Sequence, residues 1–386
     1  MRIPLPPFSH ATPSSRTAPV VPTPLETFIR HALLLSLLSM PAPILIAQNL
    51  GARIDTLMRE FDKPDVPGAS VMVIRDGAVV FKKGYGLADL ENRIPATTAT
   101  NYRLASVTKQ FTAMAILILK ERGKLSFDDV LTDFFPGFPA YGKTIKIRHL
   151  LQHTSGLIAY EDVMPETTTV QVLDRDVLAM MMHQDSTYFP PGTSFRYSNT
   201  GYALLSLIVE GVSGMPFAKF LEKNIFRPLG MEATVAYEKG ISTVPRRALG
   251  YTVRDTARGP GFERTDQSLT SAVLGDGGIY SSVEDLLKWD QALYTEKLVS
   301  ANTLREAFTP YMLPDGTNTG YGFGWYIDEH RGLRRIHHGG STVGFRTAIL
   351  RIPEKKLCVI LLANRASADP EAIALRIADI VLFEER

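Results

Sequence analysis

Short apolar runs rich in β-branched residues occur near both ends of the chain, and turn residues bound each of them. Residues 69–74 and 78–81 flank Arg75-Asp76-Gly77, a pattern that predicts a β-hairpin. An amphipathic helix is predicted from Pro370 onward. Before that helix, further strands are predicted at residues 321–327, 334–338, 347–352 and 357–363.

The middle of the chain has a helical period instead. Apolar residues recur at helical spacing between about residues 104 and 223, and glycines end the long stretches at 111–121 and 200–212. Strands at both ends with helices between them predict an α+β fold, in which N- and C-terminal strands form an antiparallel sheet flanked by helices. A mainly helical lobe is expected as an insertion at about residues 101–275.

The N-terminal residues differ in composition from the rest. The first thirty are rich in Pro, Ser and Thr and have no amphipathic period, so they are expected to be disordered. The uncharged run at residues 32–47 is interrupted by prolines and is shorter than the roughly 18 to 20 residues that a membrane-spanning helix needs. With Ala47 before Gln48, it is typical of a secretory signal; an apolar helix that packs on the domain is the alternative.

We therefore expect a disordered leader and signal-like segment at residues 1–48 and a single domain at residues 49–386. The expected location is periplasmic or secreted, with no stable membrane span. Lipid attachment directly after the apolar run is not expected, because no cysteine follows it.

Charge and cysteine content narrow the possible chemistry. Lys and Arg total 42 against 40 for Asp and Glu, so a net charge of +2 gives no electrostatic reason to expect a nucleic-acid partner. The single cysteine, Cys358, cannot form an internal disulfide and excludes the usual Cys-rich zinc and iron–sulfur sites. Hydroxyl, amine, imidazole and carboxylate groups must supply the chemistry, and no metal or other cofactor is expected.

Ser106 and Lys109 form the single Ser-x-x-Lys sequence of the chain, at the start of a strongly apolar helical run. Positions i and i+3 share a face of a helix, so the lysine amine can come within reach of the serine hydroxyl. A buried amine with a lowered pKa could act as the base that a nucleophilic serine needs. The alternative is that Ser106 caps the helix and Lys109 lies on the surface.

Tyr197 and Asn199 follow the turn signal Pro190-Pro191-Gly192 and precede a predicted helix, which places them on a loop. A protonated Lys109 nearby would favour the phenolate and lower the pKa of Tyr197. Such a pair titrates as one unit, so the sequence leaves open which member is the base. Taken alone, Tyr197 could be a half-buried tyrosine and Asn199 a turn residue.

The third candidate segment, Arg335-Ile336-His337-His338-Gly339-Gly340-Ser341, ends a predicted strand. Adjacent strand residues face opposite ways, so only one of its two histidines should line a site. Gly339 and Gly340 would let a substrate backbone approach the strand edge, and the Ser341 amide could donate to an oxyanion. The alternative is a glycine bulge that ends the strand.

Together the three segments resemble the serine β-lactamase and penicillin-binding-protein superfamily, and specifically its class C-like branch. The resemblance extends from about residue 68 to residue 364, with the motifs in the family's order. It also includes Ile147-Arg148-His149-Leu150-Leu151-Gln152-His153-Thr154-Ser155-Gly156-Leu157, Pro191-Gly192-Thr193 and Gly277-Gly278-Ile279-Tyr280-Ser281-Ser282.

The resemblance implies a serine hydrolase that works by acyl transfer. Ser106 would attack a carbonyl, while Lys109 and Tyr197 share the proton transfers and Asn199 steadies Lys109 and the acyl group. The Ser106 and Ser341 amides would hold the oxyanion. Water would then release the acyl group, with Tyr197 as its activator.

The sequence departs from the family in its third motif, which is His338-Gly339-Gly340 where many members have Lys-Thr-Gly. A neutral imidazole is a weaker partner for a carboxylate than an ammonium, so affinity for penicillin-like acids should be reduced. The variant resembles members that act on esters or on D-amino-acid amides. Arg346 could restore a substrate-binding cation, which keeps a β-lactamase or a D-Ala-D-Ala carboxypeptidase as an alternative. A silent domain that binds β-lactams or peptidoglycan fragments is a third possibility.

Other candidate motifs are less specific. His149 and His153 have the i, i+4 spacing of helical zinc ligands but lack the glutamate of a metalloprotease motif, so we interpret them as structural histidines. No Gly-x-Ser-x-Gly sequence is present, which leaves an α/β-hydrolase without support.

Overall fold

The computed structural model describes residues 42–255, 257, 259 and 261–384. The chain divides into two units, residues 1–48 and residues 49–386, and the second unit carries every candidate site residue. The disorder predicted for the first thirty residues and the first part of the signal-like run at residues 32–47 lie outside the described residues. Helix α2 begins at Ala42 and runs to Leu57, so it includes the end of that run.

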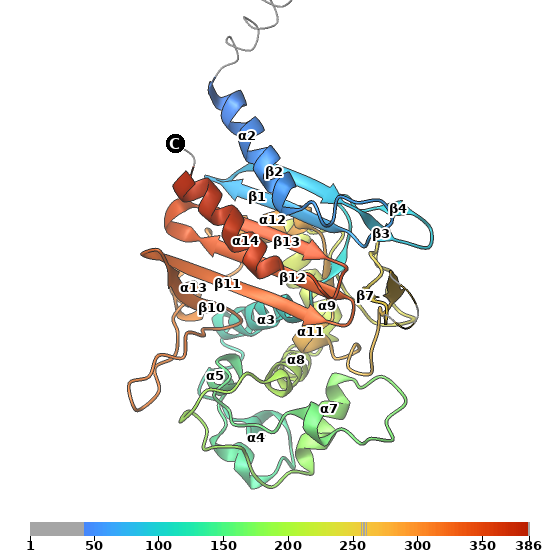
Figure 1. Cartoon of the computed structure of the whole chain (residues 1–386). Coiled ribbons are helices and arrows are strands. Elements are labelled where there is room, and N and C mark those ends of the chain that lie inside the picture. The colour runs from blue at the N-terminus through green and yellow to red at the C-terminus, as the bar shows by residue number, and fades with distance from the viewer. Residues whose placement is uncertain (1–41, 256, 258, 260, 385–386) are drawn as a thin grey trace, which may run out of the picture. The chain divides into compact units, whose positions relative to one another are not determined.

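A six-stranded antiparallel sheet forms the centre of the second unit, in the order β10-β11-β12-β13-β1-β2 (Figure 1). Strand β1 pairs with β13 over its whole length, from Ala69 opposite Ala363 to Arg75 opposite Leu357. The two ends of the domain sequence therefore meet in one sheet, as predicted. The strands are β1 (Ala69–Arg75), β2 (Ala78–Tyr85), β10 (Tyr326–His330), β11 (Leu333–Thr342), β12 (Phe345–Ile352) and β13 (Leu357–Ala363).

Three predicted strand boundaries were wrong by several residues, and the first is the end of β2, which extends to Tyr85 and not to residue 81. The predicted strand at 321–327 begins only at Tyr326, because Gly324 has a φ of 78° and an added Cβ there would lie 2.8 Å from the Lys109 carbonyl oxygen. Strand β11 continues through the two glycines to Thr342, in regular register with β12 and without a bulge. The alternation of Gly with aromatic residues resembles a strand pattern, although here it forms a turn that packs on helix α3.

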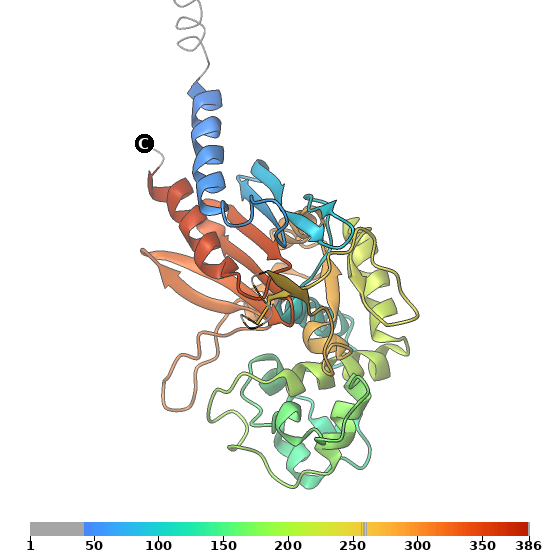
Figure 2. The same cartoon turned by 45° about the vertical axis from the view of Figure 1, so that its right-hand side comes forward.

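Each face of the sheet has its own layer of apolar side chains. Along β13, Val359 and Leu361 pack with helix α14 (Pro370–Asp379), whereas Ile360 and Leu362 belong to the larger core on the other face. The larger core includes α3 (Lys109–Glu121) and α12 (Val283–Ala292). Figure 2 shows α14 on one face of the sheet, where residues 50–57 of α2 also pack, and the helices of the middle of the chain on the other face. Alternation along a strand therefore divides the residues between two helical layers.

The helical lobe lies between β2 and β10 in the sequence. The helix predicted at 200–212 is α8 (Asn199–Ser213), which ends at Gly214 with a φ of 66°, and the helix predicted at 111–121 is α3. The other helices are α4 (Leu131–Phe134), α5 (Ile147–Leu151), α6 (Tyr160–Val163), α7 (Asp174–Met182), α9 (Phe217–Leu221), α10 (Arg227–Leu229), α11 (Leu274–Gly277) and α13 (Ala301–Ala307).

Short strand pairs complete the lobe and its connections. They are β3 (Leu87–Asp89) with β4 (Ile94–Pro95), β5 (Tyr102–Arg103) and β6 (Val235–Ala236) with β9 (Ile279–Ser281), and β7 (Tyr251–Val253) with β8 (Phe262–Arg264). Among the described helices, none is by itself long and apolar enough to cross a membrane. Asn199–Ser213 and Phe217–Leu229, bent by 74°, meet the length and composition criteria only as a pair.

Candidate active site

Ser106 lies in a short turn that leads into helix α3. A 3₁₀ helix, Ala105–Thr108, precedes α3, and Ala105 begins it with a positive φ of 49°. In a 3₁₀ helix side chains three residues apart are superposed, which brings the Lys109 Nζ within 3.2 Å of the Ser106 Oγ. Ser106 makes no capping hydrogen bond and Lys109 is fully buried, so the alternative of a helix cap beside a surface lysine is wrong.

Three acceptors surround the buried amine of Lys109. Its Nζ donates to the Asn199 Oδ1 at 2.8 Å, to the Asp276 carbonyl oxygen at 2.9 Å and to the Ser106 Oγ at 3.2 Å. Burial lowers the pKa of Lys109 to about 8, although the Asp276 and Glu161 carboxylates act in the opposite direction. A neutral amine could keep its two shorter hydrogen bonds and direct its lone pair toward Ser106, which is the geometry of a base.

Tyr197 faces the same space as Ser106. Its Oη is buried and makes no hydrogen bond of ordinary geometry with the described residues, and its ring centroid lies 4.9 Å from the Lys109 Nζ. Burial raises the pKa of Tyr197, and the neighbouring Ser106 hydroxyl lowers it to a smaller extent. The pKa of Tyr197 is thus raised, whereas the sequence-based expectation was that Lys109 would lower it.

The loop that carries Tyr197 is held by His153. The His153 Nδ1 accepts a hydrogen bond of 3.1 Å from the Ser198 amide, and its ring packs against Tyr197 at 4.2 Å between centroids. Burial holds the pKa of His153 well below its usual value, so the ring is neutral. His149 likewise accepts a 3.2 Å hydrogen bond from the Lys146 amide. Both rings therefore bind backbone amides, as expected of structural histidines.

Glu161 orients the Asn199 amide and was not found from the sequence. The Asn199 Nδ2 donates to the Glu161 Oε1 at 2.7 Å, which leaves the Oδ1 facing Lys109. Glu161 is the second residue of α6, a four-residue helix with no periodic signal of its own. Only the apposition of α6 and α8 in three dimensions identifies it.

A second missed carboxylate, Asp276, lies behind the lysine. Its carbonyl oxygen accepts from Lys109, and burial raises the pKa of its carboxyl to about 7. The turn that presents it is held by Asp174, which accepts from the amides of Leu274 at 2.8 Å and Gly275 at 3.0 Å. Figure 1 shows that α3, α8 and α11 gather beside β11. Segments far apart in the sequence therefore position one amine.

Beside Ser106, Lys109 and Tyr197, one edge of β11 is no longer paired with β10. Its last pair with β10 joins His337 to Tyr326, and the residues from His338 to Thr342 pair with β12 alone among the named strands. A pocket of about 390 Å³ lies along this free edge. Its lining includes Ser106, Tyr197, Tyr326, His338, Gly339, Gly340, Ser341, Arg346, Asp369 and Glu371. The predicted nucleophile, phenol and glycine edge thus share one pocket, with Lys109 and Asn199 behind them.

His338 lines the pocket, yet both of its ring nitrogens are occupied by protein atoms. The Nε2 lies 2.9 Å from the Tyr321 hydroxyl, and the Nδ1 lies 2.6 Å from the Gly339 carbonyl oxygen. Because a carbonyl can only accept, the Nδ1 carries the proton and the Nε2 accepts from the tyrosine. Burial also lowers the pKa of His338 to about 3, so the ring cannot supply a cation to a substrate carboxylate at neutral pH.

The other residues predicted around this strand lie as follows. His337 points to the opposite face, where its Nε2 lies 3.3 Å from Asp328. Arg346 lines the pocket, and its Nη1 donates to the carbonyl oxygens of Thr342 at 2.7 Å and Phe345 at 2.8 Å. In the described part of the chain, no group of three or more His, Cys, Asp or Glu residues is arranged to hold a metal ion.

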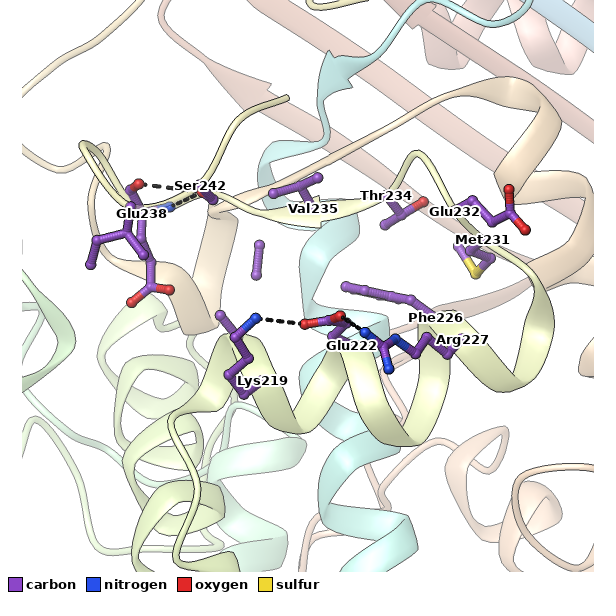
Figure 3. A pocket seen from close by; sticks show the side chains of 13 residues that line it. Lys219, Glu222, Phe226, Arg227, Met231, Glu232, Thr234, Val235, Glu238 and Ser242 are labelled. Atoms are coloured by element: carbon purple, nitrogen blue, oxygen red, sulfur yellow. Dashed lines mark hydrogen bonds and ion pairs between the residues drawn. The ribbon is translucent and has the colours of Figure 1, made fainter. Parts of the chain in front are cut away.

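A separate pocket of about 410 Å³ lies between the segment from Ala218 to Arg227 and the chain around β6 (Figure 3). Glu222 lies on its wall and accepts from Lys219 at 2.9 Å and Arg227 at 2.7 Å. None of the predicted catalytic residues reaches this pocket. Both basic residues of its wall, Lys219 and Arg227, are paired with Glu222, so neither is placed to act as a base for a hydroxyl there.

The fold and the pocket beside Ser106 define a serine hydrolase: a hydroxyl, a buried amine and a phenol lie together at the free edge of an antiparallel sheet. The chain belongs to the beta-lactamase family, whose sequence profile matches residues 54–382. The predicted family and the predicted α+β fold are therefore both confirmed.

Individual relatives agree with this assignment. Penicillin-binding protein 4* of Bacillus subtilis (strain 168) is 33% identical over 348 residues, covering 87% of this chain and 77% of that protein. A D-aminopeptidase of Gluconobacter oxydans (strain 621H) is 29% identical over 317 residues, covering 80% of this chain and 58% of its own length. The octameric penicillin-binding protein homologue from Pyrococcus abyssi has a TM-score of 0.75 and 31% identity, covering 87% of this chain and 77% of that one.

Proposed function

We propose that the protein hydrolyses small esters or peptide-like amides of D-amino acids through a covalent acyl-enzyme on Ser106. The observation that carries this proposal is the position of the Lys109 amine, 3.2 Å from the Ser106 Oγ and buried with a lowered pKa. A buried amine near its pKa can take a hydroxyl proton at neutral to mildly alkaline pH.

In the first half of the reaction, neutral Lys109 removes the Ser106 proton while Oγ attacks the substrate carbonyl. The amides of Ser106 and Ser341 stabilise the oxyanion. Collapse of the tetrahedral intermediate breaks the bond to the leaving group. The Tyr197 phenol donates a proton to that group and is reprotonated from the Lys109 ammonium, so the enzyme regains its starting charge.

In the second half, water attacks the acyl-enzyme, and its proton passes through Tyr197 to Lys109. When the tetrahedral intermediate collapses, the bond between the acyl carbon and the Ser106 Oγ breaks. The Lys109 ammonium returns the proton to that oxygen, so the free acid leaves and Ser106 and Lys109 regain their starting states. The raised pKa of Tyr197 favours this relay role over a standing phenolate. Asn199, oriented by Glu161, keeps the lysine amine directed toward Ser106.

The substrate class is argued from His338. With both ring nitrogens bound to protein atoms and a pKa lowered to about 3, this residue offers no cation to the carboxylate of a penicillin-like acid. Esters and amides that lack such a carboxylate lose less binding energy when the pocket offers no cation. The D-aminopeptidase among the relatives supports the same class of substrate.

A panel of short and long p-nitrophenyl esters, D-aminoacyl amides and cephalosporins, run beside Ser106→Ala, tests the proposal. We expect Ser106-dependent turnover of esters or D-aminoacyl amides and slow or absent hydrolysis of nitrocefin. Equal rates for the wild type and Ser106→Ala on the whole panel would contradict the proposed function.

The same substrate panel distinguishes two alternative functions from the proposed one. Arg346 on the pocket wall favours a β-lactamase or D-Ala-D-Ala carboxypeptidase, which would hydrolyse nitrocefin well above the Ser106→Ala background. A binding domain without turnover would instead form a stable acyl adduct on Ser106, visible by intact-protein mass spectrometry, with no product release.

We also propose that the chain is exported, because the apolar run at residues 32–47 precedes the domain and ends in a small residue before Gln48. N-terminal sequencing of protein recovered from the periplasm or the medium tests this. A protein that starts near Gln48 is expected, and an uncut chain retained inside the cell would contradict export.

A further inference from the structure

Glu371 lies directly over the free edge of β11. It is the second residue of α14, and a Cβ added to Gly339 would overlap its carboxylate. The glycine is therefore required for this close approach, and the carboxylate forms part of the pocket wall that also contains Ser106. The Glu371 side chain is 57% exposed, so a molecule in the pocket can reach it.

Within the residues that the structure describes, no lysine or arginine pairs with this carboxylate, and Arg335, which is paired with Asp328, attracts it only at longer range. Among the described residues Glu371 accepts no hydrogen bond, and its one ion-pair contact is the His337 Nδ1 at 3.8 Å. Burial lowers the pKa of His337 to about 4, so that ring is neutral at pH 7. Asp369 adds a second carboxylate to the wall, where it caps α14 by accepting from the Ala372 amide at 3.1 Å. This side of the pocket is therefore electronegative.

Aromatic faces stand beside the two carboxylates. The rings of Tyr197 and Tyr326 are parallel within 5°, with centroids 6.4 Å apart, and both line the pocket. Aromatic faces attract ammonium groups through their negative π-electron density. The carboxylates and the rings thus both favour a positively charged group in the pocket.

The direction of the sheet indicates which part of a substrate meets Glu371. Every pairing in the six-stranded sheet is antiparallel, and the β11 edge is free from His338 onward. A substrate that pairs with this edge as a further antiparallel strand runs in the direction opposite to β11. In the proposed reaction its reacting carbonyl lies beside Ser341. The group after the scissile bond, which is the leaving group, then lies beside Gly339 and Glu371.

We propose that Glu371 is a specificity-determining residue that favours substrates with a cationic leaving group and disfavours those whose leaving group carries a carboxylate. The proposal rests on the proposed acyl-enzyme function of Ser106. It identifies the leaving-group class of that site as an ammonium-bearing or uncharged group, not the carboxylate-bearing group of a penicillin or a C-terminal D-alanine.

The test uses three N-acetyl-D-alanyl thioesters that differ in the charge of the leaving thiol. Because an ammonium group also makes a thiol a better leaving group, the change in relative rates between wild type and Glu371→Gln carries the test. The thiols are thiocholine (cationic), 3,3-dimethylbutanethiol (its uncharged isostere) and 3-mercaptopropionate (anionic). Each turnover acylates Ser106, releases the thiol with a proton, and ends when water hydrolyses the ester. The released thiol is followed with a chromogenic disulfide, and kcat/KM is compared for the wild type, Glu371→Gln and Ser106→Ala.

We expect kcat/KM in the wild type to fall from the cationic to the neutral to the anionic thioester. In Glu371→Gln the ratio of cationic to anionic rates should fall by about tenfold, with little change for the neutral thioester. Glu354→Gln is the matched control, since it removes one exposed carboxylate from the turn at the far end of β12 and should leave the ratio unchanged.

An unchanged ratio in Glu371→Gln, or a wild type that prefers the anionic thioester, would overturn the assignment of Glu371. If the neutral thioester were still hydrolysed in a Ser106-dependent way, the proposed function would survive that result. No Ser106-dependent hydrolysis of any of the three thioesters would overturn both proposals.

Discussion

The Glu161 carboxylate accepts a hydrogen bond of 2.7 Å from the Asn199 Nδ2 amide. This contact decides which end of the asparagine faces the interior, since an amide that donates to a carboxylate must direct its oxygen the other way. That oxygen accepts from Lys109 at 2.8 Å. An exposed carboxylate thus influences the buried amine both through Asn199 and through its own charge.

The pH dependence of Glu161→Gln should report that influence. Lys109 has to be neutral to act as a base, so kcat/KM for an uncharged ester should rise with pH and level off above about 8. Glu161 raises the pKa of Lys109, so removing its charge should shift the rising limb to lower pH. Asp162→Asn, one residue along and exposed, is the control. A rising limb that stays in place or moves to higher pH would contradict this account.

Substitutions of Lys109 should separate its charge from its basicity. Lys109→Ala should lower kcat by about 10² or more, because Ser106 loses its proton acceptor. Lys109→Arg should not restore the rate, since a guanidinium stays protonated. Tyr197→Phe should also lower kcat by about 10² if the phenol relays the proton. Steady-state rates on one ester give these values, and a fully active Lys109→Arg enzyme would exclude the amine as base.

Gly340 and Gly339 should respond differently to a methyl group. A Cβ on Gly340 would overlap the Leu104 carbonyl oxygen, which is backbone and cannot move aside. Gly340→Ala should therefore lower the free energy of unfolding by about 2 kcal/mol and abolish most activity. Gly339→Ala meets only the end of the Glu371 side chain, which can rotate away. Urea denaturation measures both variants, and equal losses would show that Glu371 is not free to move.

Asp174 should matter for both stability and rate. Asp174→Ala leaves the amides of Leu274 and Gly275 without their acceptor in a buried turn. We expect a loss of about 1–3 kcal/mol in the free energy of unfolding and a lower kcat, because the Asp276 carbonyl that holds Lys109 is displaced. Ser206→Ala, which removes one hydrogen bond to the same carboxylate, is the milder comparison. A stable Asp174→Ala protein with normal kcat would show that the turn is held by other contacts.

Much of the site was predictable because the family motifs supply its central groups. Short sequences indicated Ser106, Lys109, Tyr197 and the glycine edge, which the structure brings together, and the strands at both ends of the chain indicated the sheet. Glu161, Asp276 and Glu371 were not found, since each reaches the pocket or its lysine from a segment that is distant in sequence. The pKa of Tyr197 was also misjudged, because burial depends on packing that no local pattern records.

The pairing of β1 with β13 has a consequence for biosynthesis. Ala69 lies opposite Ala363, so the β1–β2 hairpin meets its other neighbour, β13, only after almost the whole domain has been translated. Contacts this distant in sequence form slowly, and a nascent chain that lacks its last strands cannot close the sheet around the Ser106 turn. If the chain is exported, this delay favours an unfolded state that a translocation channel can accept, and the pocket beside Ser106 is completed only after passage.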